Sequence, residues 1–406
     1  MKCIAGLDVG NGYVKGKFRF DKAAPVLVDL PSTVSYTAGG DLDRMPSSAY
    51  MEDFTNKLDM TCISKGIKPM DEGRVFLGKR AIYSGQSQVE FNIDNHEPKS
   101  QDSLSTMLIL GSLAGAFLEK CYLDGVDMFS DTLTLHVGLG IALPIEDYLT
   151  YKEQYKETLL SSSHHVHVHN FEKPITIEII FDDVQVLAEG AAGQYAIASL
   201  GAAFLEKALH VARENGLAID KAYTGEMLSH ARNTIGIDIG EGTTNFPVFQ
   251  NGNVAIEVSS SINKGYGSVL STVVNRLRNT PFAFASRKDL ADFLLEEELM
   301  PNQERLKAKV MTYVEKEIAI FVRDVLKEYA NIFRKVGVRT DVVYVYGGGA
   351  NAMQKYLYPL LSKASILADG MSVPVIYLDS RYSRDLNRNG LFEAAELSEA
   401  VQKNKA

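Results

Sequence analysis

The stretch Ile235 to Phe249, IGIDIGEGTTNFPVF, decides the fold of this chain. Isoleucine stands at alternate positions up to Asp238, a glycine-rich turn follows, and an aromatic run then resumes, which is typical of a strand, a tight turn and a second strand. Glycines let backbone N–H groups approach an anion, threonine hydroxyls donate further hydrogen bonds, and an aspartate at a strand end can hold hydrated Mg²⁺. A plain glycine-rich turn remains the alternative interpretation. The turn residues are Gly240, Glu241, Gly242, Thr243 and Thr244.

A second copy of this pattern occurs in Ile4 to Phe20, IAGLDVGNGYVKGKFRF. Asp8 ends its first apolar run, and Lys15 stands on the returning strand. Asp8 and Asp238 lie 230 positions apart, which indicates two related halves. Each half is therefore predicted to bring one phosphate-binding hairpin to a shared cleft. The turn of the first hairpin contains Gly10, Asn11 and Gly12.

The pair of hairpins resembles the superfamily of actin, sugar kinases and heat-shock chaperone ATPases, in which two such loops grip the nucleotide phosphates from opposite domains. A third element, Val342 to Met353, VVYVYGGGANAM, is a buried strand that leads into glycines and a helix, where the superfamily places its adenosine loop. The order of these elements also matches the superfamily and spans nearly the whole chain. The expected adenosine-loop residues are Gly347, Gly348, Gly349 and Ala350.

This resemblance implies an α/β protein with the actin-like ATPase fold. Two related domains would each contain a mixed β-sheet flanked by helices and an inserted subdomain, with the nucleotide in the interdomain cleft. A length of 406 residues agrees with two large domains. The expected boundaries are 1–188 for domain I with a loop-rich insertion at about 25–98, 189–380 for domain II with a helical insertion at about 265–338, and 381–406 for a C-terminal helix packing back on domain I.

Composition restricts the function classes. The 46% hydrophobic content supplies a core, and no apolar run approaches the roughly 20 residues of a membrane span. Charged residues interrupt the N-terminal segment, so a strand pair is predicted there instead of a signal peptide, with a cytoplasmic location and no membrane partner. Three widely spaced cysteines suit a reducing compartment. A net charge of −9 argues against direct DNA binding, so a nucleic-acid role would need an adaptor.

Periodicity and helix-capping residues predict the remaining elements. One helix is expected to be buried on all sides and capped by Ser103 or Ser105, and another to be rich in small residues, as in a helix that crosses between domains. The expected helices are 103–123, 145–161, 189–215, 265–278, 286–299 and 306–336 separated by Pro301, 350–364 and 381–400. The expected strands are 132–144, 175–188 as two strands joined at Asp182 and Asp183, 253–259 and 373–378.

Histidines cluster in the segment SSSHHVHVH, residues 161–169. On a strand, His165, His167 and His169 would point the same way, and imidazoles at that spacing can bind zinc or nickel. No carboxylate or cysteine stands beside them, which favours a solvated strand or loop.

Within the superfamily, Gly138 to Tyr148, GLGIALPIEDY, together with Glu189 at the start of the crossover helix, resembles the bacterial actin-like proteins of the ParM and Alp type. These proteins segregate plasmids by forming ATP-dependent filaments. Sugar kinases generally carry a catalytic aspartate beside the second phosphate loop, whereas this loop continues into Asn245, Phe246 and Pro247. ParM-like relatives often carry an aspartate there too, so the geometry of the second loop stays open.

The resemblance also implies roles for individual residues. Asp8 and Asp238 would organise Mg²⁺ through water, and Glu189 would position or deprotonate the attacking water. This suits phosphoryl transfer, which depends on charge neutralisation and in-line placement of the nucleophile. The alternatives are a carboxylate stabilised by the helix dipole for Glu189 and strand-end turn residues for the two aspartates. Phosphate contacts would come from Lys15 and from the backbone of residues 10–12 and 240–244.

The function implied is that of an ATP hydrolase, with GTP as an alternative, coupled to filament assembly. Its partners would be further copies of itself and a DNA-binding adaptor protein at a plasmid centromere, and its cofactors ATP and Mg²⁺. A small-molecule kinase or phosphatase of the same superfamily is the alternative, and a nucleotide-binding scaffold without turnover is a third possibility.

Overall fold

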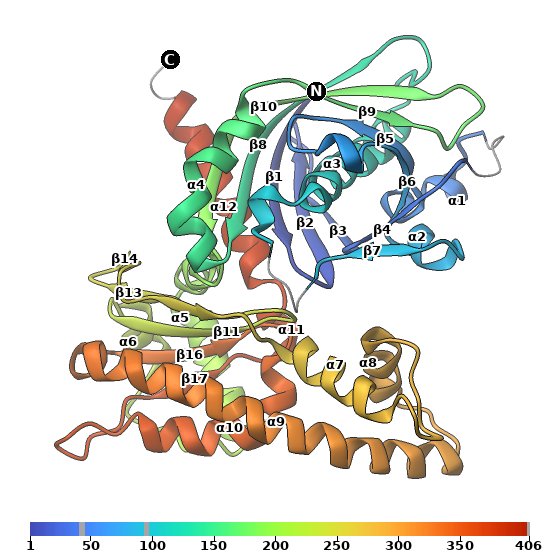
Figure 1. The fold of residues 1–406 in the computed structure, drawn as a ribbon. Helices are drawn as coiled ribbons and strands as arrows, with labels where there is room; N and C mark the ends of the chain where they lie inside the picture. The colour runs from blue at the N-terminus through green and yellow to red at the C-terminus, as the bar shows by residue number, and fades with distance from the viewer. Residues whose placement is uncertain (40–44, 93–96, 404–406) are drawn as a thin grey trace. The chain divides into compact units, whose positions relative to one another are not determined.

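The computed structural model describes residues 1–39, 45–92 and 97–403 (Figure 1). The chain divides into two compact units. The first unit contains Met1–Ala196 together with the C-terminal residues from Asp385, and the second contains Ile197–Arg384. Each unit is built on a mixed β-sheet covered by helices.

The sheet of the first unit has ten strands among the described residues, in the order β3-β2-β1-β8-β10-β9-β5-β6-β4-β7. β1 is antiparallel to β2 and parallel to β8, and β8 is in turn parallel to β10. The strands are β1 Lys2–Val9, β2 Tyr13–Phe20, β3 Val26–Pro31, β4 Thr33–Tyr36, β5 Asp59–Ile63, β6 Arg74–Leu77, β7 Gln88–Glu90, β8 Leu133–Leu143, β9 His164–Val168 and β10 Ile175–Ala188. The segment expected to be a loop-rich insertion therefore supplies β3 to β7.

The side chains of alternate residues of β1 lie on opposite faces of this sheet, as the two-residue period of a strand requires. Ala5 and Leu7 belong to the large core cluster that contains the residues of α3, whereas Ile4 packs with Phe392 and Ala395 of α12. The helices of this unit are α1 Ser48–Met51, α2 Lys79–Tyr83, α3 Ser103–Leu123, α4 Ile145–Leu160 and α12 Leu386–Lys403, with the start of α5 Ala191–Glu214 (Figure 1).

Among the described residues, α3 is the one helix long and apolar enough to cross a membrane by length and composition. In this structure 89% of its most apolar window is buried inside the protein. It is therefore the central core helix of the first unit, in agreement with the prediction of a helix without an exposed face.

Helix α12 lies so close to the sheet that only glycine fits beneath it. A methyl group on Gly140 would overlap the backbone carbonyl of Leu391, and one on Gly6 would overlap the backbone of Phe392. A backbone group cannot swing aside as a flexible side chain can. The glycines of β1 and β8 therefore set the depth at which the C-terminal helix docks.

We expect Gly140→Ala to lower the free energy of unfolding by about 1–3 kcal/mol, because the added methyl group forces α12 away from β8. Gly138→Ala is the matched control on the same face of the same strand, since its methyl group would meet only the Ile4 side-chain end, at 3.1 Å. Urea unfolding of both variants measures the difference. Equal midpoints would show that α12 can shift without cost.

The second unit repeats the plan around β11. β11 is antiparallel to β12 and β13 and parallel to β16, and β16 is parallel to β17. The strands are β11 Thr234–Ile239, β12 Thr244–Phe246, β13 Val248–Gln250, β14 Asn253–Val254, β15 Ser260–Ile262, β16 Val342–Tyr346 and β17 Val375–Tyr377. The helices are α6 Gly225–Ser229, α7 Tyr266–Leu277, α8 Arg287–Leu295, α9 Pro301–Val336, α10 Ala350–Ala364 and α11 Ser380–Ser383. In both units the first strand of the hairpin therefore has an antiparallel partner on one side and one parallel strand on the other, and a further parallel strand pairs with that one.

Several expected boundaries were wrong. The cap of α3 is Asp102, whose carboxylate accepts a hydrogen bond from the Leu104 N–H at 2.9 Å, and not Ser103 or Ser105. The two strands expected to join at Asp182 and Asp183 are the single strand β10, which absorbs the acidic pair in a bulge against β8.

The other differences lie in the second unit and at the C-terminus. Pro301 begins α9 instead of separating two helices, because proline is well accommodated in a first helical turn. The strand expected at 253–259 is limited to Asn253–Val254, and α8 ends at Leu295. The C-terminal helix expected at 381–400 is two helices, α11 and α12.

The histidine segment forms β9, which lies between β5 and β10. His164 is buried between the Ser64 hydroxyl and the Leu159 carbonyl, and its burial lowers the pKa of the imidazole. His167 and His169 contact threonine hydroxyls, each at 3.0 Å. Within the described parts of the chain, no three His, Cys, Asp or Glu side chains are grouped to hold a metal ion.

Candidate functional site

The first hairpin places Asp8 directly opposite Lys15. The Lys15 ammonium lies 3.4 Å from the Asp8 carboxylate, and Asp8 is 8% exposed. The Gly10 N–H donates to the Tyr13 carbonyl at 3.1 Å, which closes the turn between β1 and β2. The predicted carboxylate, glycine turn and lysine of the first half are therefore grouped at one end of this sheet.

Ser32 stabilises this turn, although no sequence pattern predicts that role. Its hydroxyl donates to the Gly10 carbonyl at 2.6 Å, and its N–H donates to the Gly12 carbonyl at 2.9 Å. Asn11, between the two glycines, is buried. With its carbonyls held in this way, the loop has a fixed backbone conformation, which lowers the cost of ordering it around an anion.

The second hairpin reproduces the first at an offset of 230 residues. Asp238 lies opposite Asn245, and the Gly240 N–H donates to the Thr243 carbonyl at 2.9 Å. Asn245 thus occupies the position that Lys15 has in the first hairpin, so the second carboxylate faces a neutral amide. The Thr244 hydroxyl donates its single proton to the Lys264 carbonyl at 2.8 Å. In this arrangement the hydroxyl has no proton left to donate to a phosphate.

The start of α7 supports the second turn from outside. The Tyr266 N–H donates to the Gly240 carbonyl at 2.9 Å, and the Gly267 N–H donates to the Glu241 carbonyl at 2.8 Å. Arg287 also pairs with the Glu241 carboxylate at 2.8 Å. The carbonyls of this turn are thereby directed toward α7. Gly242 completes the turn before β12.

The predicted adenosine loop packs directly on the second hairpin. Gly347 has a φ of +96°, and a methyl group there would overlap the Asp238 carboxylate and the Ile239 carbonyl. The Gly349 N–H donates to the same Ile239 carbonyl at 2.9 Å, and Ala350 then begins α10. Tyr346 lies opposite Asp238 in the sheet, and burial, followed by the nearby carboxylate, raises the pKa of its phenol well above the usual value.

We expect Gly347→Ala to destabilise the second unit by about 1–3 kcal/mol, since alanine resists the left-handed backbone and its methyl group displaces Asp238. Gly348→Ala is the matched control, because it is exposed and a methyl group there meets nothing within 4 Å. Thermal unfolding without nucleotide compares the two variants. A Gly347 variant as stable as its neighbour would contradict this packing.

Glu189 lies next to a lysine that the sequence analysis missed. The Lys99 ammonium is 2.6 Å from Glu189 Oε1 and 2.9 Å from the Val9 carbonyl, and the two side chains are 7% and 9% exposed. The Glu189 N–H donates to the Leu143 carbonyl at the end of β8. Helix α5 starts at Ala191, two residues after Glu189, and has no acidic residue in its first turn.

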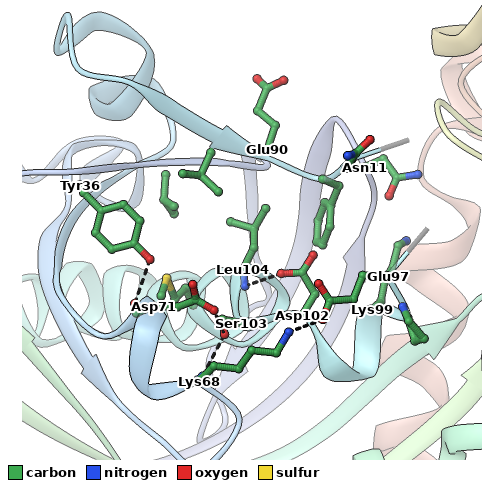
Figure 2. Close-up of a pocket in the computed structure, with 16 residues that line it drawn as sticks. Asn11, Tyr36, Lys68, Asp71, Glu90, Glu97, Lys99, Asp102, Ser103 and Leu104 are labelled. Atoms are coloured by element: carbon green, nitrogen blue, oxygen red, sulfur yellow. Dashed lines mark hydrogen bonds and ion pairs between the residues drawn. The ribbon is translucent and has the colours of Figure 1, made fainter. Parts of the chain in front are cut away.

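A pocket of about 550 Å³ opens beside this group in the first unit. Figure 2 shows Asn11 and Lys99 on its wall, together with Lys68 paired to Glu97. Asp102 also lines it, and burial raises the pKa of that carboxyl above its usual range. The turn of the first hairpin, through Asn11, thus borders a cavity within its own unit.

The residues present fit a magnesium nucleotide. Asp8 and Asp238 are hard oxygen donors at the ends of buried strands, and both adjoin glycine-containing turns, in which Gly10, Gly12 and Gly240 are half-buried. The predicted residues fall into two sets, one in each unit. The set in the first unit is Asp8, residues 10–12, Lys15 and Glu189. The set in the second unit is Asp238, residues 240–244 and residues 347–350.

Comparison with solved structures identifies the same fold in other proteins. An archaeal actin homologue matches with a TM-score of 0.59 and 16% identity over 98% of this chain and 99% of its own. Bacillus thuringiensis ParM with ATP matches with a TM-score of 0.58 and 15% identity over 98% and 99%. A Bacillus thuringiensis ParM hybrid with ADP, containing two ParM mutants, matches with a TM-score of 0.61 and 16% identity over 98% of this chain, which spans 49% of the hybrid.

Family models match both halves of the chain. The model of the N-terminal domain of actin-like proteins matches residues 6–191, and the model of the C-terminal part of the archaeal MreB-like actin homologue matches residues 236–358. No curated protein matches the chain. Together the two models cover more than half of it, and each includes one of the two hairpins. The chain therefore belongs to the actin-like proteins.

Proposed function

We propose that this protein binds and hydrolyses ATP with Mg²⁺ and assembles into nucleotide-dependent filaments. The observation that carries the proposal is the repeated hairpin, in which Asp8 and Asp238 each stand beside a glycine turn closed by the same hydrogen bond. Two carboxylates and two anion-binding turns suit a triphosphate and its metal ion. The ATP and ADP forms of ParM among the structural neighbours add support.

In the proposed mechanism the protein mainly orients groups and balances charge, as phosphoryl transfer requires. The turns at residues 10–12 and 240–244 bind the phosphates, Lys15 adds positive charge, and residues 347–350 bind the nucleoside. Asp8 and Asp238 would hold Mg²⁺ through water, and the bound ion would supply positive charge to the phosphate oxygens. Glu189 orients the attacking water and accepts its proton.

We further propose that the filaments segregate plasmid DNA in the cytoplasm. A net charge of −9 disfavours a broad direct contact with DNA, so an adaptor protein at a plasmid centromere would supply the link. GTP remains an alternative to ATP, because the backbone turns contact phosphates and not the base.

Sedimentation tests this function. Purified protein is centrifuged with ATP and Mg²⁺, with ADP and Mg²⁺, with ATP and a chelator, and without nucleotide. We expect a pellet with ATP and Mg²⁺ and little without nucleotide or metal. Hydrolysis by a protein that stays in the supernatant at every concentration would favour the kinase or phosphatase alternative, which transfer of phosphate to an added acceptor would then identify.

A further inference from the structure

Lys99 is a buried lysine whose ammonium joins three parts of the first unit. It contacts the Glu189 carboxylate and the Val9 carbonyl, and it lies 5.8 Å from the centre of the Phe91 ring. Its backbone N–H donates to the Asp147 carboxylate at 3.1 Å, at the start of α4. Lys99 is thus fixed at both its backbone and its charged end.

This arrangement connects Glu189 to the first phosphate turn. Val9 is the last residue of β1, directly before Gly10, so a shift of that turn moves the Val9 carbonyl with it. An ammonium group has three donors, and two of them are directed at Glu189 and Val9. A lysine is rarely buried this deeply unless its charge is paired. The contact therefore holds the carboxylate at a set distance from the turn.

We infer that Lys99 is a positioning residue for the hydrolysis proposed above: it holds the Glu189 carboxylate in place relative to the first phosphate turn and acts on the reaction only through Glu189. The inference rests on the proposed ATPase function. Positioning matters because a misplacement of about 1 Å in a catalytic group lowers a rate by roughly 10²-fold. Lys15 has a different partner, because it pairs with Asp8 on the hairpin itself, whereas Lys99 pairs with Glu189.

A double-mutant cycle tests this role, with Lys99→Met, Glu189→Gln and the combination of both. We expect Lys99→Met to lower kcat by roughly 10²-fold while the Kd for ATP changes by less than about threefold. The double variant should be no slower than Glu189→Gln alone, since Lys99 then has no carboxylate to place. Lys68→Met is the control, because Lys68 lines the same pocket but pairs with the exposed Glu97.

The same variants give a readout without nucleotide. Lys99→Met leaves a buried carboxylate without its cation, so its Tm should fall, whereas the double variant removes both charges and should recover most of the loss. If Lys99→Met does not fold, the kinetic test is the comparison of kcat between the double variant and Glu189→Gln.

The outcomes separate the two proposals. A wild-type kcat in Lys99→Met, a double variant slower than Glu189→Gln, or a large rise in the Kd for ATP overturns the positioning role and leaves the ATPase function standing. The last result would indicate a direct phosphate contact. Absence of ATP hydrolysis by the unmodified protein overturns the proposed function itself, and the positioning role with it.

Discussion

Asp238→Asn is expected to lower ATP hydrolysis by roughly 10³-fold, because it removes a charge that organises the metal at the phosphates. Asparagine keeps the volume of the side chain, which matters at a position that is 5% exposed and packed against Gly347. The fold should therefore persist. Phosphate release at saturating ATP and Mg²⁺ measures the effect, and circular dichroism checks the fold.

Two further variants serve as a parallel test and as a control for Asp238→Asn. Asp8→Asn should behave alike, because Asp8 has the same place in the other hairpin. Asp292→Asn, on the exposed face of α8, should hydrolyse ATP as the unmodified protein does. Near-normal turnover by a folded Asp238→Asn variant would remove this carboxylate from the reaction and leave it as a turn residue.

Glu189→Gln is expected to bind ATP normally and to lower hydrolysis by roughly 10²- to 10⁴-fold, the usual contribution of a positioned general base. Glutamine is preferred to alanine because its amide oxygen can still accept a hydrogen bond from the buried Lys99 ammonium. Binding should persist because the proposed phosphate contacts come from the two hairpins and not from Glu189. The Kd for ATP and single-turnover hydrolysis separate the two steps.

This variant should also separate assembly from turnover. If subunits leave the filament after hydrolysis, slower chemistry lengthens filament lifetime, so light scattering after a limited pulse of ATP should decay far more slowly than in the unmodified protein. Decay on the original timescale, or hydrolysis at the normal rate, would mean that another residue orients the water.

The hairpins were predictable from the sequence because their signals are local. Alternating apolar residues give the strands, and the glycines of 10–12 and 240–242 give the turns. Their repetition indicated two related units, and in both units the first hairpin strand lies between an antiparallel and a parallel neighbour. The actin-like fold predicted from this repetition is confirmed by the structural neighbours.

The contacts around the site were not predictable, because they join residues far apart in the chain. Lys99 and Glu189 are 90 positions apart, and nothing in the sequence around Lys99 distinguishes it from an exposed lysine. Ser32 braces a turn about 20 residues before it through its position at the end of β3. The start of α9 was missed because a proline can end one helix or begin the next, and the bulge in β10 was missed because it arises from pairing with β8.

The measurement that most directly tests nucleotide-dependent assembly is the rate of phosphate release as a function of protein concentration, with light scattering recorded on the same sample. The account predicts little release below a critical concentration and a linear rise above it, with scattering rising at the same point. Release proportional to protein concentration from the lowest value upward, without scattering, would contradict coupling of hydrolysis to filament formation and identify an ATPase that works as a single subunit.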